Sequence, residues 1–290
     1  MRSCTDKDDT YRNIMKYWLA SCLAAALYLL AGAIIYQRLW RGSAPSGSAL
    51  TGVAKAATFA FGTIAVVLHA FVLHSTLQVD AGLNLALANA VSLVAWAMAA
   101  LFLVTTLYKP IVNLGIVVMP VSGLSVLAAW LWPGHPVILA TGSPLQSWHI
   151  IISVLAYGLL ALAVIQSLLW FAQEHQLRQR QAGTLLHALP PLETMERLMF
   201  QLIALGFVLL TLTLVSGAMF SDQLFGKPLR FTHHVVLSLL SWLVFAILLF
   251  GRWHFGWRGR PAVRWILGGF TLLALAYFGT KFVMEIVLGR

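Results

Sequence analysis

Five histidines lie near the ends of long apolar runs of this sequence. His69 and His74 stand in the last part of the second run, His149 opens the fifth, and His233 and His234 open the seventh. If each run crosses a membrane as a helix, all five reach the same side. Ionisable side chains inside a membrane are costly and point to function by default. We therefore expect a histidine-lined site at one face of the membrane.

The spacing within the two pairs limits which histidines can share that site. His69 and His74 are five residues apart, which is about 140° around a helix. His233 and His234 are adjacent and diverge by about 100°. One member of each pair is therefore expected to point away. We expect His149 and His233 to be the main ligands, with His69 next, and keep His234 and His74 as further candidates.

The ligand chemistry favours haem iron. Neutral imidazoles suit transition metals and haem. Cys4 and Cys22 are the only cysteines, so a thiolate metal site and a CxxC redox pair are excluded. Asp80 is the only carboxylate near these histidines, which favours haem over bare zinc or copper. Lys227 and Arg230 precede His233 and are either ordinary loop cations or partners for haem propionates.

The composition indicates which elements must position these residues. The chain is 60% hydrophobic and 10% charged, with a mean hydropathy of +0.85, which excludes a soluble domain. We expect an all-α integral membrane protein, a bundle of about eight transmembrane helices. Residues 1–14 are expected to be a polar leader that precedes the native start, and residues 15–290 a single transmembrane helical domain. The apolar runs fall at about 15–36, 52–75, 85–107, 111–132, 148–171, 199–220, 233–250 and 263–286.

The basic residues predict the orientation of the chain. The net charge of +10 comes from Lys and Arg that mostly flank the apolar runs, where they act as topological signals and attract lipid headgroups. We expect no nucleic-acid partner. Eleven Lys and Arg fall on one side and eight on the other, and loops 76–84 and 133–147 carry none. Both termini and the five candidate histidines are therefore expected outside the cytoplasm.

Two other classes of function stay open. Pro110, Asn113, Pro120 and Gly123 could interrupt the fourth helix, as in transporters with discontinuous helices. In that case the histidines would be proton relays for a small-molecule transporter. A non-catalytic membrane scaffold is the other alternative. P-loop, HExxH, catalytic-serine and paired-carboxylate motifs are absent from the sequence, so an enzyme is not expected.

Four segments resemble one known family. They are WHIIISVLAYGLLALAVIQSLLW at 148–170, GFVLLTLTLVSGAMF at 206–220, LLSWLVFAILLFGRWHFGWRGR at 239–260 and YFGTK at 277–281. From about His69 onward the chain is similar to the cytochrome c assembly protein family, and more closely to its YpjD-like inner-membrane branch. The last two segments are the most specific, because they include polar and glycine positions that hydrophobicity alone would not produce.

The resemblance implies a multi-pass inner-membrane protein that handles haem at the extracytoplasmic face, with other membrane assembly factors as potential partners. It places His149 on a haem-ligand histidine of the family, His69 on a histidine early in the family core, and His233 where the branch carries histidine. The family's tryptophan-rich haem-handling segment is replaced here by SDQLFGKPLRFTHH at 221–234, and Phe250 stands where the family has a second histidine.

Overall fold

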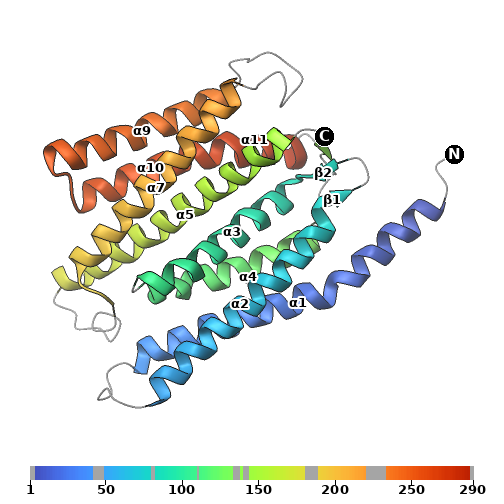
Figure 1. Cartoon of the computed structure of the whole chain (residues 1–290), viewed down its shortest axis with the longest axis horizontal. Coiled ribbons are helices and arrows are strands. Elements are labelled where there is room, and N and C mark those ends of the chain that lie inside the picture. Colours follow the sequence, from blue (N-terminus) through green and yellow to red (C-terminus); the bar gives the residue numbers. More distant parts are fainter. Residues whose placement is uncertain are drawn as a thin grey trace.

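The computed structural model is a helical bundle, which confirms the predicted all-α membrane fold (Figure 1). Eight of its helices are long and apolar enough to cross a membrane. The structure describes these residues: 4–41, 49–79, 82–109, 111–132, 138–139, 144–179, 189–219 and 233–287.

The helices fall into two groups along the chain. The N-terminal half comprises α1 (Cys4–Arg41), α2 (Ala49–Leu77), α3 (Leu87–Tyr108), the short 3-10 helix η1 (Val112–Leu114) and α4 (Gly115–Leu131). The C-terminal half comprises α5 (Pro144–Arg178), α7 (Leu192–Met219), α9 (His233–Phe255), α10 (Arg260–Ala274), the π-helix η2 (Leu275–Gly279), α11 (Thr280–Phe282) and the π-helix η3 (Val283–Val287).

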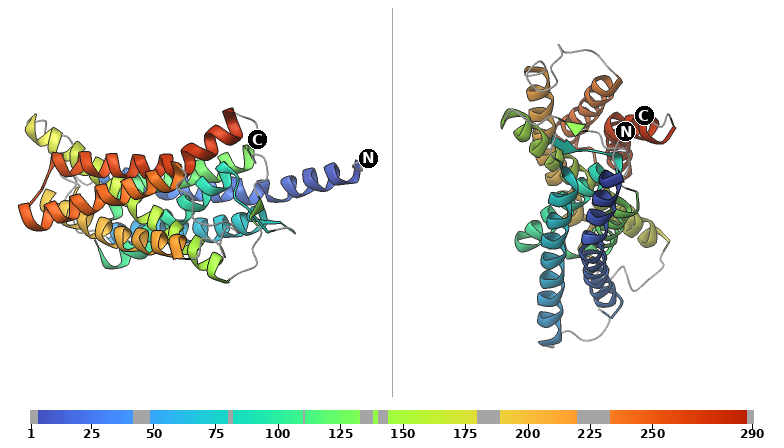
Figure 2. Two further views of the ribbon diagram at one scale, coloured as in Figure 1. Left: turned by 90° about the horizontal axis from the view of Figure 1, so that it is seen from above. Right: turned by 90° about the vertical axis from the view of Figure 1, so that its right-hand side faces the viewer.

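The two halves pack side by side along α3 and α5. Seen end-on, α1 and α2 lie at one side of the bundle and α9 and α10 at the other (Figure 2). The main hydrophobic core runs through both halves, from Tyr28 in α1 through Phe102 in α3 to Phe245 in α9. The polar residues of the expected leader, from Cys4 onward, continue α1 as helix beyond the apolar span Tyr17–Arg38.

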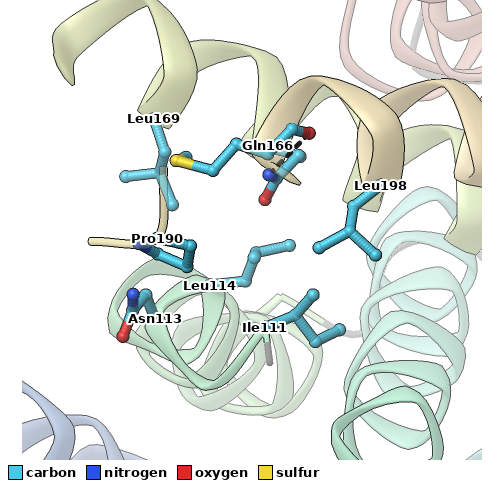
Figure 3. Close-up of a pocket in the computed structure, with 8 residues that line it drawn as sticks. Ile111, Asn113, Leu114, Gln166, Leu169, Pro190 and Leu198 are labelled. Atoms are coloured by element: carbon cyan, nitrogen blue, oxygen red, sulfur yellow. Dashed lines mark hydrogen bonds between the residues drawn. The ribbon is translucent and has the colours of Figure 1, made fainter. Parts of the chain in front are cut away.

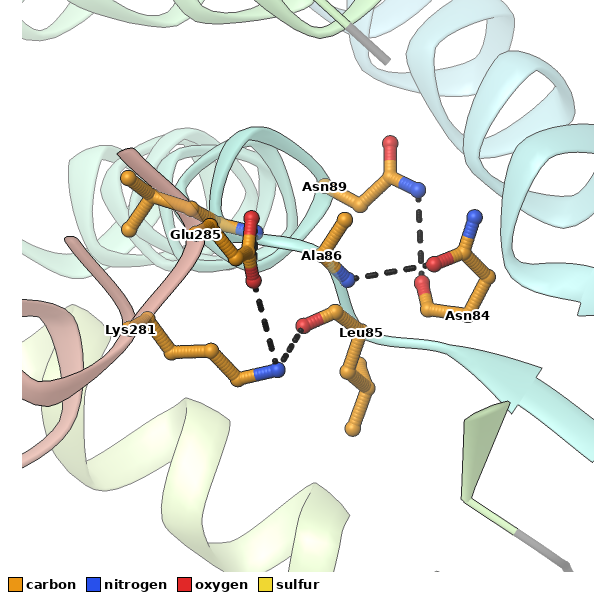
Figure 4. Close-up of polar contacts among 7 residues, drawn as sticks. Asn84, Leu85, Ala86, Asn89, Lys281 and Glu285 are labelled. Atoms are coloured by element: carbon orange, nitrogen blue, oxygen red, sulfur yellow. Dashed lines mark hydrogen bonds and ion pairs between the residues drawn. The ribbon is translucent and has the colours of Figure 1, made fainter. Parts of the chain in front are cut away.

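A small sheet, which the apolar pattern did not predict, joins loops at one end of the bundle. Strands β1 (Gln78–Val79), β2 (Gly82–Asn84) and β3 (Ile138–Leu139) pair antiparallel in that order. The C-terminal segment contacts the chain directly after this sheet (Figure 4). Both carboxylate oxygens of Glu285 accept the Leu87 N–H, at 3.1 and 2.9 Å, and Lys281 Nζ donates to the Leu85 carbonyl at 2.7 Å. A carboxylate stabilises the unpaired N–H groups of a helix start, so η3 fastens the C-terminal half to α3.

Ion pairs gather at the opposite end. Arg252 Nη1 lies 2.7 Å from Glu196 Oε1, and Arg260 Nη2 lies 2.9 Å from Glu174 Oε2. Glu174 also pairs with Arg178 one turn further along α5. These contacts join α5, α7, α9 and α10 at the end that the sequence predicts to be rich in cations.

The expected interruption of the fourth helix is not present in α4, which runs through Pro120 without a break. The irregular turn falls earlier, at η1. Pro120 packs on α1, where a Cβ added to Gly32 would lie 3.2 Å from its Cδ. Proline is tolerated within membrane helices, and here it serves a close helix contact. Asn113 thus lies in an irregular turn, Pro120 and Gly123 lie in a continuous helix, and Pro110 lies outside the described residues.

Candidate functional site

His149 lies near the start of α5 with its ring held by α7. Its Nδ1 is 2.8 Å from Ser216 Oγ, and that hydroxyl donates to the Thr213 carbonyl at 3.0 Å. Because the single hydroxyl proton of Ser216 is committed to Thr213, Nδ1 of His149 must be the donor. A neutral imidazole of this tautomer carries its lone pair on Nε2, the form that binds metal ions.

His234 is the second histidine of this region. It lies in the first turn of α9, half-buried, with its ring edge-on to Tyr277 of η2 at 6.2 Å between centroids. The imidazoles of His234 and His149 are close enough to interact electrostatically. The neighbouring His233 is exposed. Of the adjacent pair, His234 is therefore the half-buried member and the one that interacts electrostatically with His149.

His69 is in a different environment. It is 0% exposed, its Nδ1 lies 3.3 Å from the Tyr28 hydroxyl and its Nε2 lies 2.8 Å from Ser92 Oγ. Both ring nitrogens are thus engaged by hydroxyl groups of α1 and α3. His69 belongs to the N-terminal half, whereas His149 and His234 belong to the C-terminal half.

The remaining candidates are His74, Lys227 and Arg230. His74, in the last turn of α2, is exposed. Lys227 and Arg230 lie outside the described residues. Of the seven residues that the sequence nominates, His149 and His234 are two half-buried histidines with an electrostatic interaction between them.

The structure adds residues that the histidine pattern does not include. Ser216 orients His149, and Tyr277 packs against His234. Tyr157 donates from its hydroxyl to the Leu273 carbonyl at 2.8 Å, just before the helix changes from α to π. π-Helical turns are frequent at functional sites. Ser216 and Tyr277 stand inside the segments LTLVSGAMF and YFGTK, so the family motifs contained this signal.

The number of metal-ligating side chains limits which cofactor the site could bind. Within the described ranges there is no group of three or more His, Cys, Asp or Glu side chains that could hold a metal ion. Protein-bound zinc takes at least three such ligands. Haem iron takes only axial ligands from the protein, typically histidine. In ligand number alone, two imidazoles match the requirement of haem iron rather than that of zinc.

Comparison with known proteins supports this reading of the motifs. The family model for the cytochrome c assembly protein matches residues 57–288. The inner membrane protein YpjD of Escherichia coli (strain K12) is 31% identical over 230 residues, which cover 77% of this chain and 85% of YpjD. The cytochrome c biogenesis protein CcsA of Gloeobacter violaceus is 32% identical over 104 residues, 36% of this chain and 31% of CcsA. The chain belongs to the cytochrome c assembly protein family.

Proposed function

We propose that this chain is an inner-membrane protein of cytochrome c assembly that binds or transfers haem near the starts of α5 and α9. The observation that carries the proposal is that His149 and His234, near the starts of α5 and α9, are half-buried imidazoles that interact electrostatically. Family membership supports it, since the relative CcsA is named for cytochrome c biogenesis. The relative YpjD is named an inner membrane protein, which supports the same location here.

Each residue of this site has a distinct role in the proposal. Haem would supply an iron that imidazole nitrogens can coordinate. His149 would coordinate through Nε2, because Nδ1 donates to Ser216. That hydrogen bond fixes the tautomer and ring orientation, as outer partners of metal-bound histidines do. His234 would provide a second imidazole, and Tyr277 packs against its ring. Lys227 and Arg230, just before α9 in sequence, are candidate partners for the propionates.

The orientation of the bundle supports an extracytoplasmic site. His149 and His234 lie near the starts of α5 and α9. The ion pairs of Arg252 and Arg260 lie at the other end. Cationic residues favour the cytoplasmic side of membrane proteins. We therefore propose that the histidine end faces outward, with both termini on that side.

The test is the absorption spectrum of protein purified after expression with ample haem. We expect a Soret band, and a pyridine haemochrome assay that reports haem b or c chemistry, with both signals lost in His149→Ala. The exposed His254→Ala variant, at the far end of α9, should keep the wild-type spectrum. No Soret band in wild-type protein, together with a stably co-purifying membrane protein, would favour the scaffold alternative instead.

A further inference from the structure

A small cavity lies far from the histidines, where η1, α5 and the start of α7 meet (Figure 3). Its wall is mostly apolar, formed by Ile111, Leu114, Leu169 and Leu198. Two polar side chains also line it, Asn113 and Gln166. A cavity with a purely apolar wall stays dry, whereas polar groups in the wall allow a water molecule to bind.

Gln166 has a buried side-chain oxygen beside this cavity. Its side chain is 1% exposed, and its Nε2 donates to the Met195 carbonyl at 3.0 Å. Its Oε1 has no hydrogen-bond partner in the part of the chain that the structure describes. Figure 3 shows this oxygen directed into the cavity. A buried carbonyl oxygen without a donor is costly, so such a group in a native protein calls for a partner.

The orientation of this carboxamide is fixed by its neighbour. The oxygen and nitrogen of a glutamine side chain are assigned from the hydrogen bonds they make. The Met195 carbonyl can only accept, so Nε2 of Gln166 must face it. Rotating the amide by half a turn would place two oxygens against each other. The oxygen must therefore face the cavity, and the missing partner must be a donor.

The cavity has room for about one water molecule. We propose that it binds a single internal water that donates to Gln166 Oε1. Asn113 is the second polar group in its wall, on η1 of the N-terminal half. Buried waters typically connect polar groups of this kind. The water thus hydrates the contact between the two halves, at the end opposite His149 and His234. Its binding does not depend on haem.

The test is hydroxyl-radical footprinting by brief X-ray irradiation, because side chains beside ordered internal waters are oxidised even when bulk water is excluded. Met195 lines the cavity and is 2% exposed, whereas Met199, one turn further along α7, is 0% exposed and does not line it. In wild-type protein in nanodiscs, we expect Met195 to be oxidised several-fold faster than Met199, with oxygen from isotope-labelled water. Equal rates for the two methionines would show that the cavity is dry and would overturn the proposal.

A variant pair sharpens the test. Gln166→Leu removes the acceptor and fills part of the cavity, so oxidation of Met195 should fall to the level of Met199. Gln146→Leu replaces another buried glutamine of the same helix, near its other end, and should leave Met195 oxidation unchanged. If Met195 is oxidised equally fast in wild type and in folded Gln166→Leu, Gln166 does not bind the water and the proposal is wrong. Should Gln166→Leu fail to fold, the ratio of the Met195 and Met199 oxidation rates in wild-type protein remains the test.

Discussion

The two halves of the molecule use buried histidine in different ways. In the N-terminal half, His69 has both ring nitrogens bound by hydroxyl groups, from Tyr28 and Ser92, and no exposed surface. In the C-terminal half, His149 and His234 are half-buried imidazoles from separate helices that lie near each other. The first arrangement joins three helices, and the second suits ligand binding. The partners of a histidine, more than its depth, indicate its role.

The largest expected effect is a difference in haem content between variants of the two adjacent histidines of α9. His234→Ala should abolish the Soret band, because it removes the half-buried imidazole that interacts electrostatically with His149. His233→Ala, the matched control, replaces an exposed ring and should leave the haem content unchanged. The haem content is measured by the pyridine haemochrome assay. Loss of haem in His233→Ala with retention in His234→Ala would reverse the assignment of the inward-facing residue.

A second prediction concerns the stability of the N-terminal half. His69→Ala leaves the hydroxyl groups of Tyr28 and Ser92 without their buried partner and opens a cavity. The expected loss is about 3 kcal/mol in the free energy of unfolding. Thermal unfolding in detergent measures it. His74→Ala replaces an exposed histidine on the same helix and is the control. A His69→Ala variant as stable as this control would contradict a structural role.

Weakening the contact between the two halves should lower the stability of the protein but leave its haem content unchanged. Glu285→Gln keeps an oxygen that accepts the Leu87 N–H but removes the charge that faces Lys281, 3.6 Å away in a nearly buried pair. We expect a loss of about 1–2 kcal/mol in unfolding free energy, read as a lower melting temperature. The haem content of the folded fraction should equal that of wild type. A specific loss of haem would mean that η3 takes part in the site.

The smallest effect is expected for a change of Ser216, whose hydroxyl orients His149. Ser216→Ala removes the acceptor of the Nδ1 proton, so haem should still bind, with an affinity lower by about 10-fold. Haem titration followed at the Soret band measures this. Ser153→Ala is the control, since its hydroxyl donates to the backbone carbonyl of His149 at 2.6 Å. Equal affinities in the two variants would remove Ser216 from the proposed site.

The helices were predictable from the sequence, because an apolar run of this length has few alternatives to a membrane-spanning helix. The short strands β1, β2 and β3 and the π-turns of η2 and η3 were not predicted. Strands of two or three residues have no hydrophobic period of their own. A π-turn depends on contacts such as Tyr157 with Leu273, which are far apart in the sequence.

The candidate site was predictable in part. The angle between neighbouring helix positions implies that His233 and His234 cannot both face inward. The inward member is set by the packing of α9 on η2, which the local sequence does not contain. His69 could not be separated from the other histidines, because the hydroxyl groups that bind it come from α1 and α3. The segment at 221–232 that precedes α9, with Lys227 and Arg230, lies outside the described residues.

The most direct test of the central claim is the haem-to-protein ratio of two variants purified side by side, His149→Ala and His69→Gln. Both replace a partly or fully buried imidazole, and glutamine at position 69 can still hydrogen-bond the hydroxyl groups around it. The account predicts that His69→Gln retains the wild-type ratio and His149→Ala loses it. A wild-type ratio in His149→Ala together with loss in His69→Gln would place the haem site in the N-terminal half and contradict the account.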